Sequence, residues 1–314
     1  MTPAARVAMI AGTVCGAALL LAPASRTVRA VATQAADSTV VVLGTGTPNA
    51  DPDRSGPAVA IVRGANAYLV DAGPGVVRRA AAAARAGIAA LDAKRLRVVF
   101  LTHLHSDHTL GLPDLIFTPW VLERTAPLEV YGPPGTNAMV EHLLAAYTAD
   151  VRNRLDGLEP ANETGHKVNV HEIANGFVYR DSNIVVRAFE VPHGDWEHAL
   201  AYRFETPDRS IVVSGDTRAS DSVVKACNGC DVLLHEVYSA ERLTTRPPEW
   251  QAYHARAHTS TKELAALATR AKPRLLVLYH QLYWGTDDER LAAEVRAAGY
   301  AGAVVSAKDL AVYR

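Results

Sequence analysis

The sequence is poor in cysteine and in aromatic residues, with three cysteines and 6% aromatic residues among 314. Cys15 lies in the apolar N-terminal segment, so only Cys227 and Cys230 remain for the rest of the chain. A metal site built on this pair would need two more ligands close by, and a redox motif would need a thioredoxin-like setting. The Cys-Asn-Gly-Cys spacing favours a local disulfide in an oxidising compartment, with two free thiols as the alternative.

Acidic residues are absent from the N-terminus, where no Asp or Glu precedes Asp37. The segment contains Arg6, continues as an apolar run over residues 7–21, and ends in small residues with Ala-x-Ala sites such as residues 30–32. This order predicts a cleaved signal peptide over residues 1–35 and a periplasmic or secreted protein. A retained membrane anchor is disfavoured because the run is shorter than the about 20 residues that span a bilayer.

The chain also lacks an excess of positive charge. Without residues 1–35 it has 29 basic and 33 acidic residues, a net charge of −4. This sign argues against a general nucleic-acid binder, although a local basic patch remains compatible with it. Low-complexity segments and fixed-period repeats are absent too, which excludes a solenoid fold. The sequence does not predict an oligomeric state.

Short apolar runs predict strands, and longer stretches between them predict helices. Strands are expected at residues 38–43, 59–63, 67–71, 98–101, 128–131, 184–191, 199–205, 211–214, 232–235, 274–279, 303–304 and 310–313. Helices are expected at residues 76–86, 136–147, 221–226, 259–270 and 287–298, and a polar loop or arm at residues 150–165. Two similar halves of this kind predict an α/β fold, with two mixed sheets packed face to face and helices outside, in one domain over residues 38–314.

Histidines are concentrated in one place. Residues 102–108 read Thr-His-Leu-His-Ser-Asp-His and follow the strand expected at residues 98–101. Neutral imidazoles and a carboxylate are ligands that Zn²⁺ prefers, and this spacing brings the side chains to one point. Three of the twelve histidines fall within six residues, which makes a chance His-rich surface loop a poor explanation. We therefore predict a metal site on the loop that leaves this strand, built from His103, His105, Asp107 and His108.

Three further ligand candidates end or follow predicted strands, which places them at the same sheet edge. His193 follows the strand at residues 184–191 and is favoured over its rival His198, which enters the next strand. Asp216, in Ser-Gly-Asp-Thr, is placed to bridge two metal ions, although a plain turn has the same signature. His280 ends an apolar strand, where a buried core histidine is the alternative.

Glu236 and His258 are expected to act on protons instead. Glu236 directly follows the strand at residues 232–235, and His258 lies just before the helix at residues 259–270. His258 is expected to be a general acid or a donor that supports a ligand, and Glu236 to orient a neighbour or shuttle protons. His254 is expected to be a surface residue.

Taken together, these residues resemble the metallo-β-lactamase superfamily, and most closely its ribonuclease Z-like and arylsulfatase-like branch. The matching motifs run in family order through nearly all of the chain after the N-terminal segment. They are residues 44–48 (Gly-Thr-Gly-Thr-Pro), 71–73 (Asp-Ala-Gly), 102–108, His193, residues 214–218 (Ser-Gly-Asp-Thr-Arg), 235–236 (His-Glu), 258–260 (His-Thr-Ser) and His280. The heptapeptide with its downstream partners is the specific part of this match.

The resemblance implies an αββα sandwich and a binuclear metal site at one edge of its two sheets. The ions would be two Zn²⁺, with Mn²⁺ or Fe as alternatives. The first ion would be held by His103, His105 and His193, the second by Asp107, His108 and His280, and Asp216 would bridge both. Asp107 would hold or deprotonate the water, and His258, with Glu236 behind it, would protonate the leaving oxygen.

The sequence therefore predicts an exported binuclear hydrolase in which a metal-activated hydroxide attacks phosphodiester or related ester bonds of a small-molecule substrate. Alternatives are a sulfatase, lactonase or β-lactamase, a tRNA 3′ endonuclease of ribonuclease Z type, and a non-catalytic metal-binding protein. General nucleic-acid binding is doubtful because of the net charge and the predicted export. Trp120, Trp196, Trp250 and Trp284 fall near the predicted site loops, where they would line an apolar pocket or pack in the core or rim.

Overall fold

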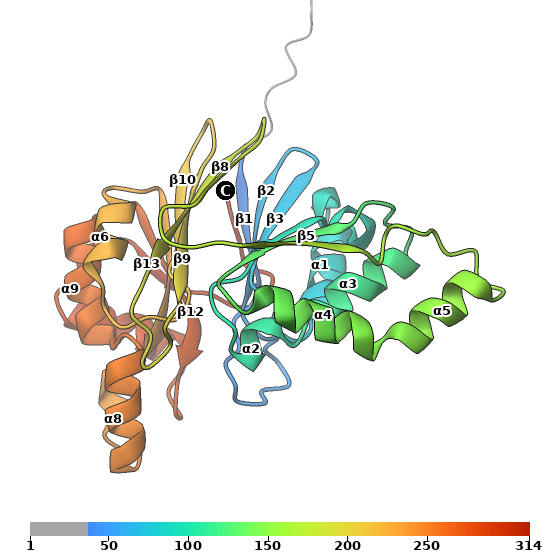
Figure 1. Cartoon of the computed structure of the whole chain (residues 1–314). Coiled ribbons are helices and arrows are strands. Elements are labelled where there is room, and N and C mark those ends of the chain that lie inside the picture. The colour runs from blue at the N-terminus through green and yellow to red at the C-terminus, as the bar shows by residue number, and fades with distance from the viewer. Residues whose placement is uncertain (1–36) are drawn as a thin grey trace, which may run out of the picture. The chain divides into compact units, whose positions relative to one another are not determined.

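Two seven-stranded sheets lie face to face, and helices cover the outer side of each (Figure 1). The computed structural model describes residues 37–314. The α/β sandwich expected from the sequence is thereby confirmed. The predicted signal peptide at residues 1–35 lies outside the described residues, so export and localisation stay predictions.

Each sheet joins an antiparallel part to a parallel part. In spatial order the first sheet consists of β14 (Val312–Tyr313), β1 (Thr39–Gly44), β2 (Ala58–Arg63), β3 (Asn66–Val70), β4 (Val98–Phe100), β5 (Leu128–Gly132) and β6 (Val168–Glu172). The second consists of β13 (Val304–Ser306), β12 (Leu275–Leu282), β11 (Val232–Tyr238), β10 (Ser210–Val213), β9 (Leu200–Glu205), β8 (Val185–Glu190) and β7 (Val178–Arg180). The strands from β3 to β6 are parallel in the first sheet, and those from β10 to β13 are parallel in the second.

The helices follow the same division. The first half of the chain contains α1 (Val76–Arg85), the 3-10 turns Ala89–Leu91 and Ala93–Arg95, α2 (Ser106–Thr109), α3 (Leu112–Val121), α4 (Thr136–Ala146) and α5 (Thr148–Asp156). The second half contains α6 (Asp221–Cys227), α7 (Ala240–Leu243), α8 (Pro248–Ala257), α9 (Thr261–Ala271) and α10 (Asp288–Ala297). A capping box begins α9, because the Ser260 and Glu263 side chains each accept a hydrogen bond from the other's backbone N–H.

Alternation along the strands builds three apolar layers. In β1, Val40 and Val42 face the other sheet, whereas Val41 and Leu43 face the helices outside. Between the sheets, the ring centroid of the buried Phe100 lies 5.0 Å from that of Tyr131 and 5.5 Å from that of Tyr202. A buried Phe of this kind contributes about 3–5 kcal/mol to stability. Because Phe100 ends β4, this packing fixes the strand from which the histidine loop starts.

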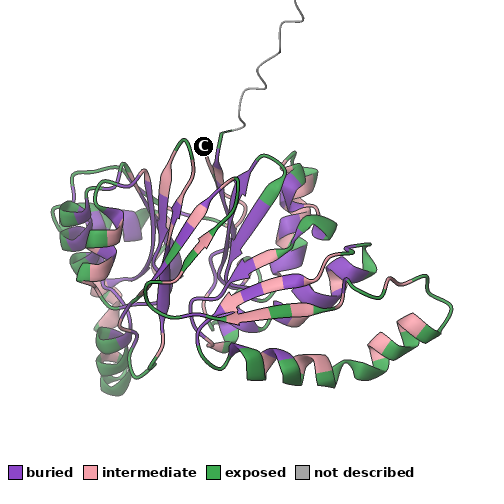
Figure 2. Cartoon of the chain, turned by 45° about the horizontal axis from the view of Figure 1, so that its top comes forward, coloured by how far each residue is buried: buried purple, intermediate pink, exposed green. Residues whose placement is uncertain are grey.

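Some elements differ from the sequence prediction. Residues 150–165 were predicted to be a loop, but α5 occupies their first part, supported by ion pairs from Arg154 to Asp150 and Glu159 at 3.1 and 2.6 Å. No residue of this helix is fully buried, and only Val151 and Leu155 pack against the core, an apolar pattern too short for the sequence to indicate a helix. In Figure 2 it extends from the body of the protein as a largely exposed arm. The helices α3 and α8 and the strands β6 and β7 were also missed, α3 because Pro113 and Pro119 interrupt its pattern.

Candidate metal centre

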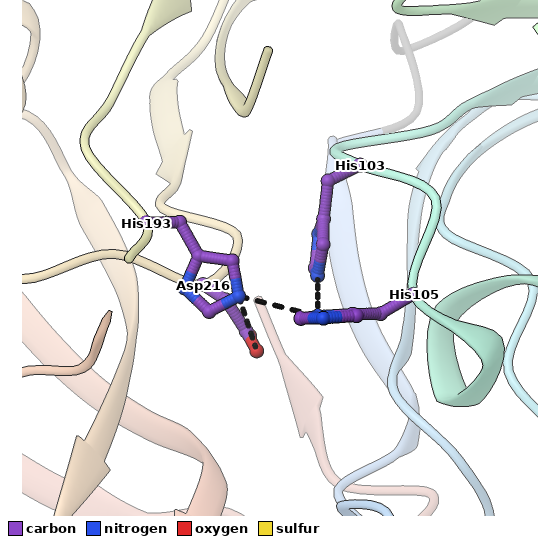
Figure 3. A group of neighbouring side chains, drawn as sticks. All are labelled: His103, His105, His193 and Asp216. Atoms are coloured by element: carbon purple, nitrogen blue, oxygen red, sulfur yellow. Dashed lines mark hydrogen bonds and ion pairs between the residues drawn. The ribbon is translucent and has the colours of Figure 1, made fainter. Parts of the chain in front are cut away.

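His103, His105, His193 and Asp216 converge from three segments of the chain (Figure 3). His103 and His105 lie on the loop after β4, His193 follows β8, and Asp216 follows β10. Nε2 of His103 and Nε2 of His193 lie 2.8 and 3.2 Å from Nδ1 of His105. Each of the four residues offers a ligand atom, and these atoms all lie within 4.8 Å of one another.

A second group adjoins the first. Nε2 of His280 and Nε2 of His108 lie 3.2 and 3.6 Å from Oδ2 of Asp107. Asp216 lies between the groups, with Oδ1 3.3 Å from Nε2 of His108, and Oδ2 3.4 Å from His280 and 4.0 Å from His193. The structure therefore brings all seven predicted ligand residues together, whereas His198 lies outside both groups with a 39% exposed side chain. We call the seven residues the metal cluster: His103, His105, Asp107, His108, His193, Asp216 and His280.

Asp71 holds two rings of the cluster from behind. Its carboxylate accepts hydrogen bonds from the backbone N–H of Thr102 at 2.7 Å and from the Thr102 hydroxyl at 2.9 Å, and it lies 2.8 Å from Nδ1 of His108. The Thr102 hydroxyl in turn lies 3.0 Å from Nδ1 of His103. Because this hydroxyl donates to Asp71, it accepts from Nδ1–H of His103, which leaves Nε2 of that ring free to face inward.

Backbone strain accompanies this arrangement. Asp71 and His280 have φ angles of 61° and 46°, a left-handed conformation that residues other than glycine seldom adopt. Gly215, at φ 58°, precedes Asp216, and a Cβ atom there would lie 2.8 Å from Cβ of Thr102. The close approach of the β4 and β10 loops therefore requires glycine, and strain of this kind persists at sites that the surrounding structure over-determines.

Burial shifts the pKa of some cluster residues, and neighbouring charges outweigh burial at others. Burial lowers the pKa of His103 well below its usual value and that of His105 to about 4, so both rings are neutral at neutral pH. Burial also opposes charge on His108, but Asp216 and Asp71 outweigh it and raise the pKa of that ring. Burial likewise opposes charge on Asp216, but His280 and His108 hold the pKa of this carboxyl well below its usual range.

The donor set fits divalent cations. Nε2 of His108 and Oδ1 of Asp216 are buried, lie 3.3 Å apart and make no hydrogen bond. In the first group, the inward nitrogens of three largely neutral imidazoles face one another. Buried polar atoms are rarely left without a partner, and a cation between Nε2 of His108 and Oδ1 of Asp216 would give both atoms one. Imidazole and carboxylate ligands suit Zn²⁺, Mn²⁺ and Fe, so the residues fit a metal without fixing its identity.

His258 and Glu236 form a buried pair beside the cluster. Nδ1 of His258 lies 3.3 Å from Oε1 of Glu236, which also accepts the backbone N–H groups of Thr217 and Thr259 at 3.1 and 3.0 Å. Burial lowers the pKa of His258 to about 4, and burial together with the Asp216 charge raises the pKa of Glu236 well above its usual value. A ring that is neutral at neutral pH can act as an acid only after it has taken up a proton.

The position of His258 also allows a second interpretation. Its side chain forms a third potential ligand group with Asp216 and His280, and Nδ1 lies 3.9 Å from Oδ2 of Asp216. The general-acid role of His258, with Glu236 behind it, therefore stays a prediction, as do the individual ligand roles in the cluster.

A pocket of about 670 Å³ opens next to the cluster. Trp250 and Trp284 line it, which is one of the two alternatives that the sequence left open for the tryptophans. Trp196 lies at a neighbouring pocket of about 320 Å³, with Nε1 2.6 Å from Nε2 of His105. Trp120 is a core residue instead, whose Nε1 donates to the Asn162 carbonyl.

His254 corrects another expectation. It was expected to be a surface residue, yet it is only 7% exposed and packs between aromatic rings. Sequence reasoning also gave no role to Asp71, although a carboxylate at the end of β3 was the same signal that indicated Asp216. Arg246 and Tyr253 line the large pocket too, and sequence reasoning gave neither a role; Tyr253 lies on α8, which was not foreseen.

Two further observations concern the chain as a whole. Cys227 and Cys230 are joined in a disulfide, as favoured from their spacing. Within residues 37–314, no helix is both long enough and apolar enough to cross a membrane.

Comparison with known proteins gives one family. A model of the β-lactamase superfamily domain matches residues 66–281. Ribonuclease Z of Mycobacterium bovis (strain BCG / Pasteur 1173P2) is 35% identical over 275 residues, which cover 86% of this chain and 96% of that protein. Ribonuclease Z of Mycobacterium marinum is 34% identical over 277 residues, with the same coverage.

Solved structures show the same fold. The metallo-β-lactamase fold protein YhfI from Bacillus subtilis superposes with a TM-score of 0.67 at 18% identity, covering 89% of this chain and 100% of that one. Human tRNase Z, short form, superposes with a TM-score of 0.64 at 23% identity, covering 88% and 98%. At these identities the likeness concerns the fold alone.

The relatives overturn one prediction from the sequence. A small-molecule ester substrate was expected and nucleic-acid binding was doubted, but the similar proteins are by name ribonucleases. The doubt rested on the predicted export and on the net charge of −4, and a global charge does not describe the local field at a binding site. With a matching domain model, relatives aligned over almost their whole length, and a cluster that fits metal ions, this chain belongs to the metallo-β-lactamase superfamily and, within it, to the ribonuclease Z-like branch of metal-dependent hydrolases.

Proposed function

We propose that the protein is an RNA phosphodiesterase of the ribonuclease Z type, which cleaves tRNA precursors at their 3′ side. The observation that carries this proposal is the complete metal cluster, on a chain 35% identical to a ribonuclease Z over 96% of that enzyme. Arg246 lines the adjacent pocket and supplies a cation beside the site, although the chain as a whole is slightly acidic.

Two Zn²⁺ ions are the proposed cofactor, with Mn²⁺ or Fe as alternatives. His103, His105 and His193 would hold the first, Asp107, His108 and His280 the second, and Asp216 would contact both. When bound, such ions lower the pKa of a shared water and neutralise charge on the transferring phosphoryl group.

The protein's own residues orient the ligand rings and supply a proton to the leaving oxygen. Asp71 keeps the His108 ring in one orientation, and Thr102 does the same for His103. Neutral His258 donates Nδ1–H to Glu236, so its Nε2 lone pair is available to take up a proton and deliver it to the leaving oxygen. Asp107 is the candidate for holding the attacking water.

The decisive experiment uses the full chain and a pre-tRNA with a 3′ trailer. We expect metal bound to the purified protein, a single cleavage at the 3′ side of the tRNA body, loss of cleavage with a chelator, and recovery with Zn²⁺ or Mn²⁺. His193→Ala and His198→Ala form a matched pair, because only His193 belongs to the cluster. We expect metal and activity to be lost in the first variant and kept in the second. A metal-loaded protein that hydrolyses no RNA would overturn the proposal.

A further inference from the structure

Four aromatic rings form one side of the large pocket, and the proposed hydrolysis gives none of them a role. Trp250, Tyr253 and His254 come from α8, and Trp284 from the turn after β12. All four line the pocket that also contains Asp107, Asp216 and His258. We call these four residues the aromatic wall.

The outer rings of the wall are free to accept a ligand. Trp250 is 47% exposed and Tyr253 is 41% exposed, and their centroids lie 5.7 Å apart in an edge-to-face arrangement. Large exposed rings beside a catalytic site mark a surface that another molecule covers. Both rings line one pocket, and their planes meet at 88°, so a flat aromatic group can stack on one ring while its edge contacts the other.

The inner rings give the wall a rigid backing. His254 is stacked on Trp250 with an interplanar angle of 26°, and its centroid lies 4.7 Å from that of Trp284. Trp284 has a φ of 46°, a strained conformation for a bulky residue, and its carbonyl accepts a hydrogen bond from Nε of Arg242 at 3.0 Å. Strain is retained where the surroundings over-determine a residue, and at functional sites in particular.

A cation completes the surface. The guanidinium of Arg246 lies 5.8 Å from the centroid of Trp284, and its Nε atom has no hydrogen-bond partner among the described residues. Aromatic faces together with an arginine plane are what proteins use to hold unpaired nucleotides, the rings stacking on bases and the cation meeting a phosphate.

The wall is continuous with the metal cluster. The ring centroid of His258 lies 5.9 Å from that of Tyr253 and 5.4 Å from that of His254. The His258 ring is also stacked on His280, with a centroid distance of 5.9 Å. A base stacked on the wall would therefore lie next to His258, and the phosphate that reacts at the metal cluster would be its neighbour.

We propose that Trp250 stacks on one unpaired nucleobase next to the scissile bond, that Tyr253, at 88° to Trp250, contacts the edge of this base, and that Arg246 contacts the adjoining phosphate. This inference rests on the proposed function and adds its recognition element. Stacking uses a face that every base has, so the wall selects an unpaired nucleotide without selecting its identity.

The test compares two RNAs with wild-type protein and Trp250→Ala. One RNA carries the normal base beside the cleavage site and the other an abasic nucleotide there. Loss of one stacked base corresponds to about a 10-fold change in affinity. We therefore expect removal of the base to cost the wild type about 10-fold in kcat/KM, and the Trp250→Ala variant almost nothing further, because the two changes remove the same contact.

Two further variants keep the test independent of folding. Trp250→Phe retains a stacking ring and is expected to stay within about 3-fold of the wild type on normal RNA. Tyr253→Ala is matched to Tyr147→Ala, since both tyrosines are 41% exposed but Tyr147 follows α4, away from the pocket. Only Tyr253→Ala should lose discrimination between the two RNAs.

The possible failures are distinguishable. If metal-loaded wild type cleaves neither RNA, the proposed function fails and the base subsite fails with it. If wild type cleaves both RNAs equally well, or if the losses from the abasic nucleotide and from Trp250→Ala simply multiply, the proposed function stands and the base subsite is overturned.

Discussion

The metal cluster and the aromatic wall share one pocket but are built in opposite ways. In the cluster, His103, Asp216 and His280 are at most 3% exposed and are held by hydrogen bonds, ion pairs and strained backbone. In the wall, Trp250 and Tyr253 expose 47% and 41% of their surface and are held by ring contacts. Chemistry needs donors fixed in one geometry, whereas a base needs a face that stays open.

The two regions also differ in where they come from in the chain. Cluster residues come from α2, from β12 and from the loops after β4, β8 and β10, so elements of both sheets must fold before they meet. The wall comes from α8 and the turn after β12, two neighbouring pieces of the second half. Substitutions can therefore disable one region while leaving the other intact.

The largest effect is expected from Asp216→Asn, which removes the charge between the two ligand groups and keeps the shape. Metal-ion catalysis is worth several kcal/mol and each 1.36 kcal/mol is tenfold, so kcat/KM should fall at least about a thousandfold. Metal content should fall as well, while RNA binding to the wall persists. Metal analysis, kinetics and RNA anisotropy measure the three quantities.

Asp195→Asn is the matched control for this change, because Asp195 has an 87% exposed side chain and pairs with Arg256. That variant should keep its metal and its activity. Full turnover and full metal content in Asp216→Asn would show that this carboxylate does not bridge the two groups.

His258 lies at the border between cluster and wall, and its replacement separates an acid from a ligand. General acid–base catalysis contributes about 100- to 10,000-fold, so His258→Ala should lower kcat by that range while metal content holds. His142→Ala, at an exposed histidine of α4, should change neither quantity. Loss of a metal ion from His258→Ala would identify His258 as a ligand, as its grouping with Asp216 and His280 allows.

Acid should destabilise the metal-free protein in part through His235, a residue of β11. His235 is fully buried, and burial lowers its pKa to about 4 from a usual value of 6.5. Between these pH values the unfolded chain binds the proton and the folded chain does not, so the free energy of unfolding falls as the pH falls. One such histidine contributes up to about 3 kcal/mol.

Chemical unfolding of the metal-free protein at several pH values between 7 and 4 measures this dependence. His235→Gln cannot titrate, so its unfolding free energy should depend less steeply on pH, whatever its absolute stability. An unchanged slope would mean that His235 is not the group responsible.

The sequence predicted the cluster well and the wall hardly at all. Cluster residues follow short apolar runs or, like His280, lie in one, and hydrophobic pattern locates such runs well. The same logic applied to Asp71 would have found the carboxylate behind His108. His254, by contrast, lies on a helix that follows two prolines, and nothing in its surroundings along the chain indicated burial between rings.

Charge was misleading for a related reason. The net value of −4 sums the whole surface, whereas a substrate meets Arg246 and its immediate neighbours. A helix without buried residues, such as α5, is likewise invisible to hydrophobic pattern. Sequence patterns thus report buried apolar strands well, and they report exposed recognition surfaces poorly.

The smallest expected effect is a change in tryptophan fluorescence, in which Trp196 reports on the metal cluster and Trp250 on the aromatic wall. Trp196 donates its Nε1–H to Nε2 of His105 at 2.6 Å, so the proton of that imidazole lies on Nδ1. Nδ1 is the atom that faces His103 and His193, and binding a metal there moves the proton to Nε2. Two N–H groups cannot face each other at this distance, so Trp196 must turn away, at a cost of about one hydrogen bond, or 1 kcal/mol.

Zn²⁺ should therefore change the intrinsic fluorescence of the metal-free protein through Trp196, and RNA should change it through Trp250. Trp196→Phe is expected to lose the response to Zn²⁺ and to keep the response to RNA, and Trp250→Phe to show the reverse pattern. If Trp196→Phe still gives the full Zn²⁺ response, His105 does not bind the ion through Nδ1. If instead both variants lose both responses, the cluster and the wall move as one unit, and their division into a fixed chemical part and an open recognition part is wrong.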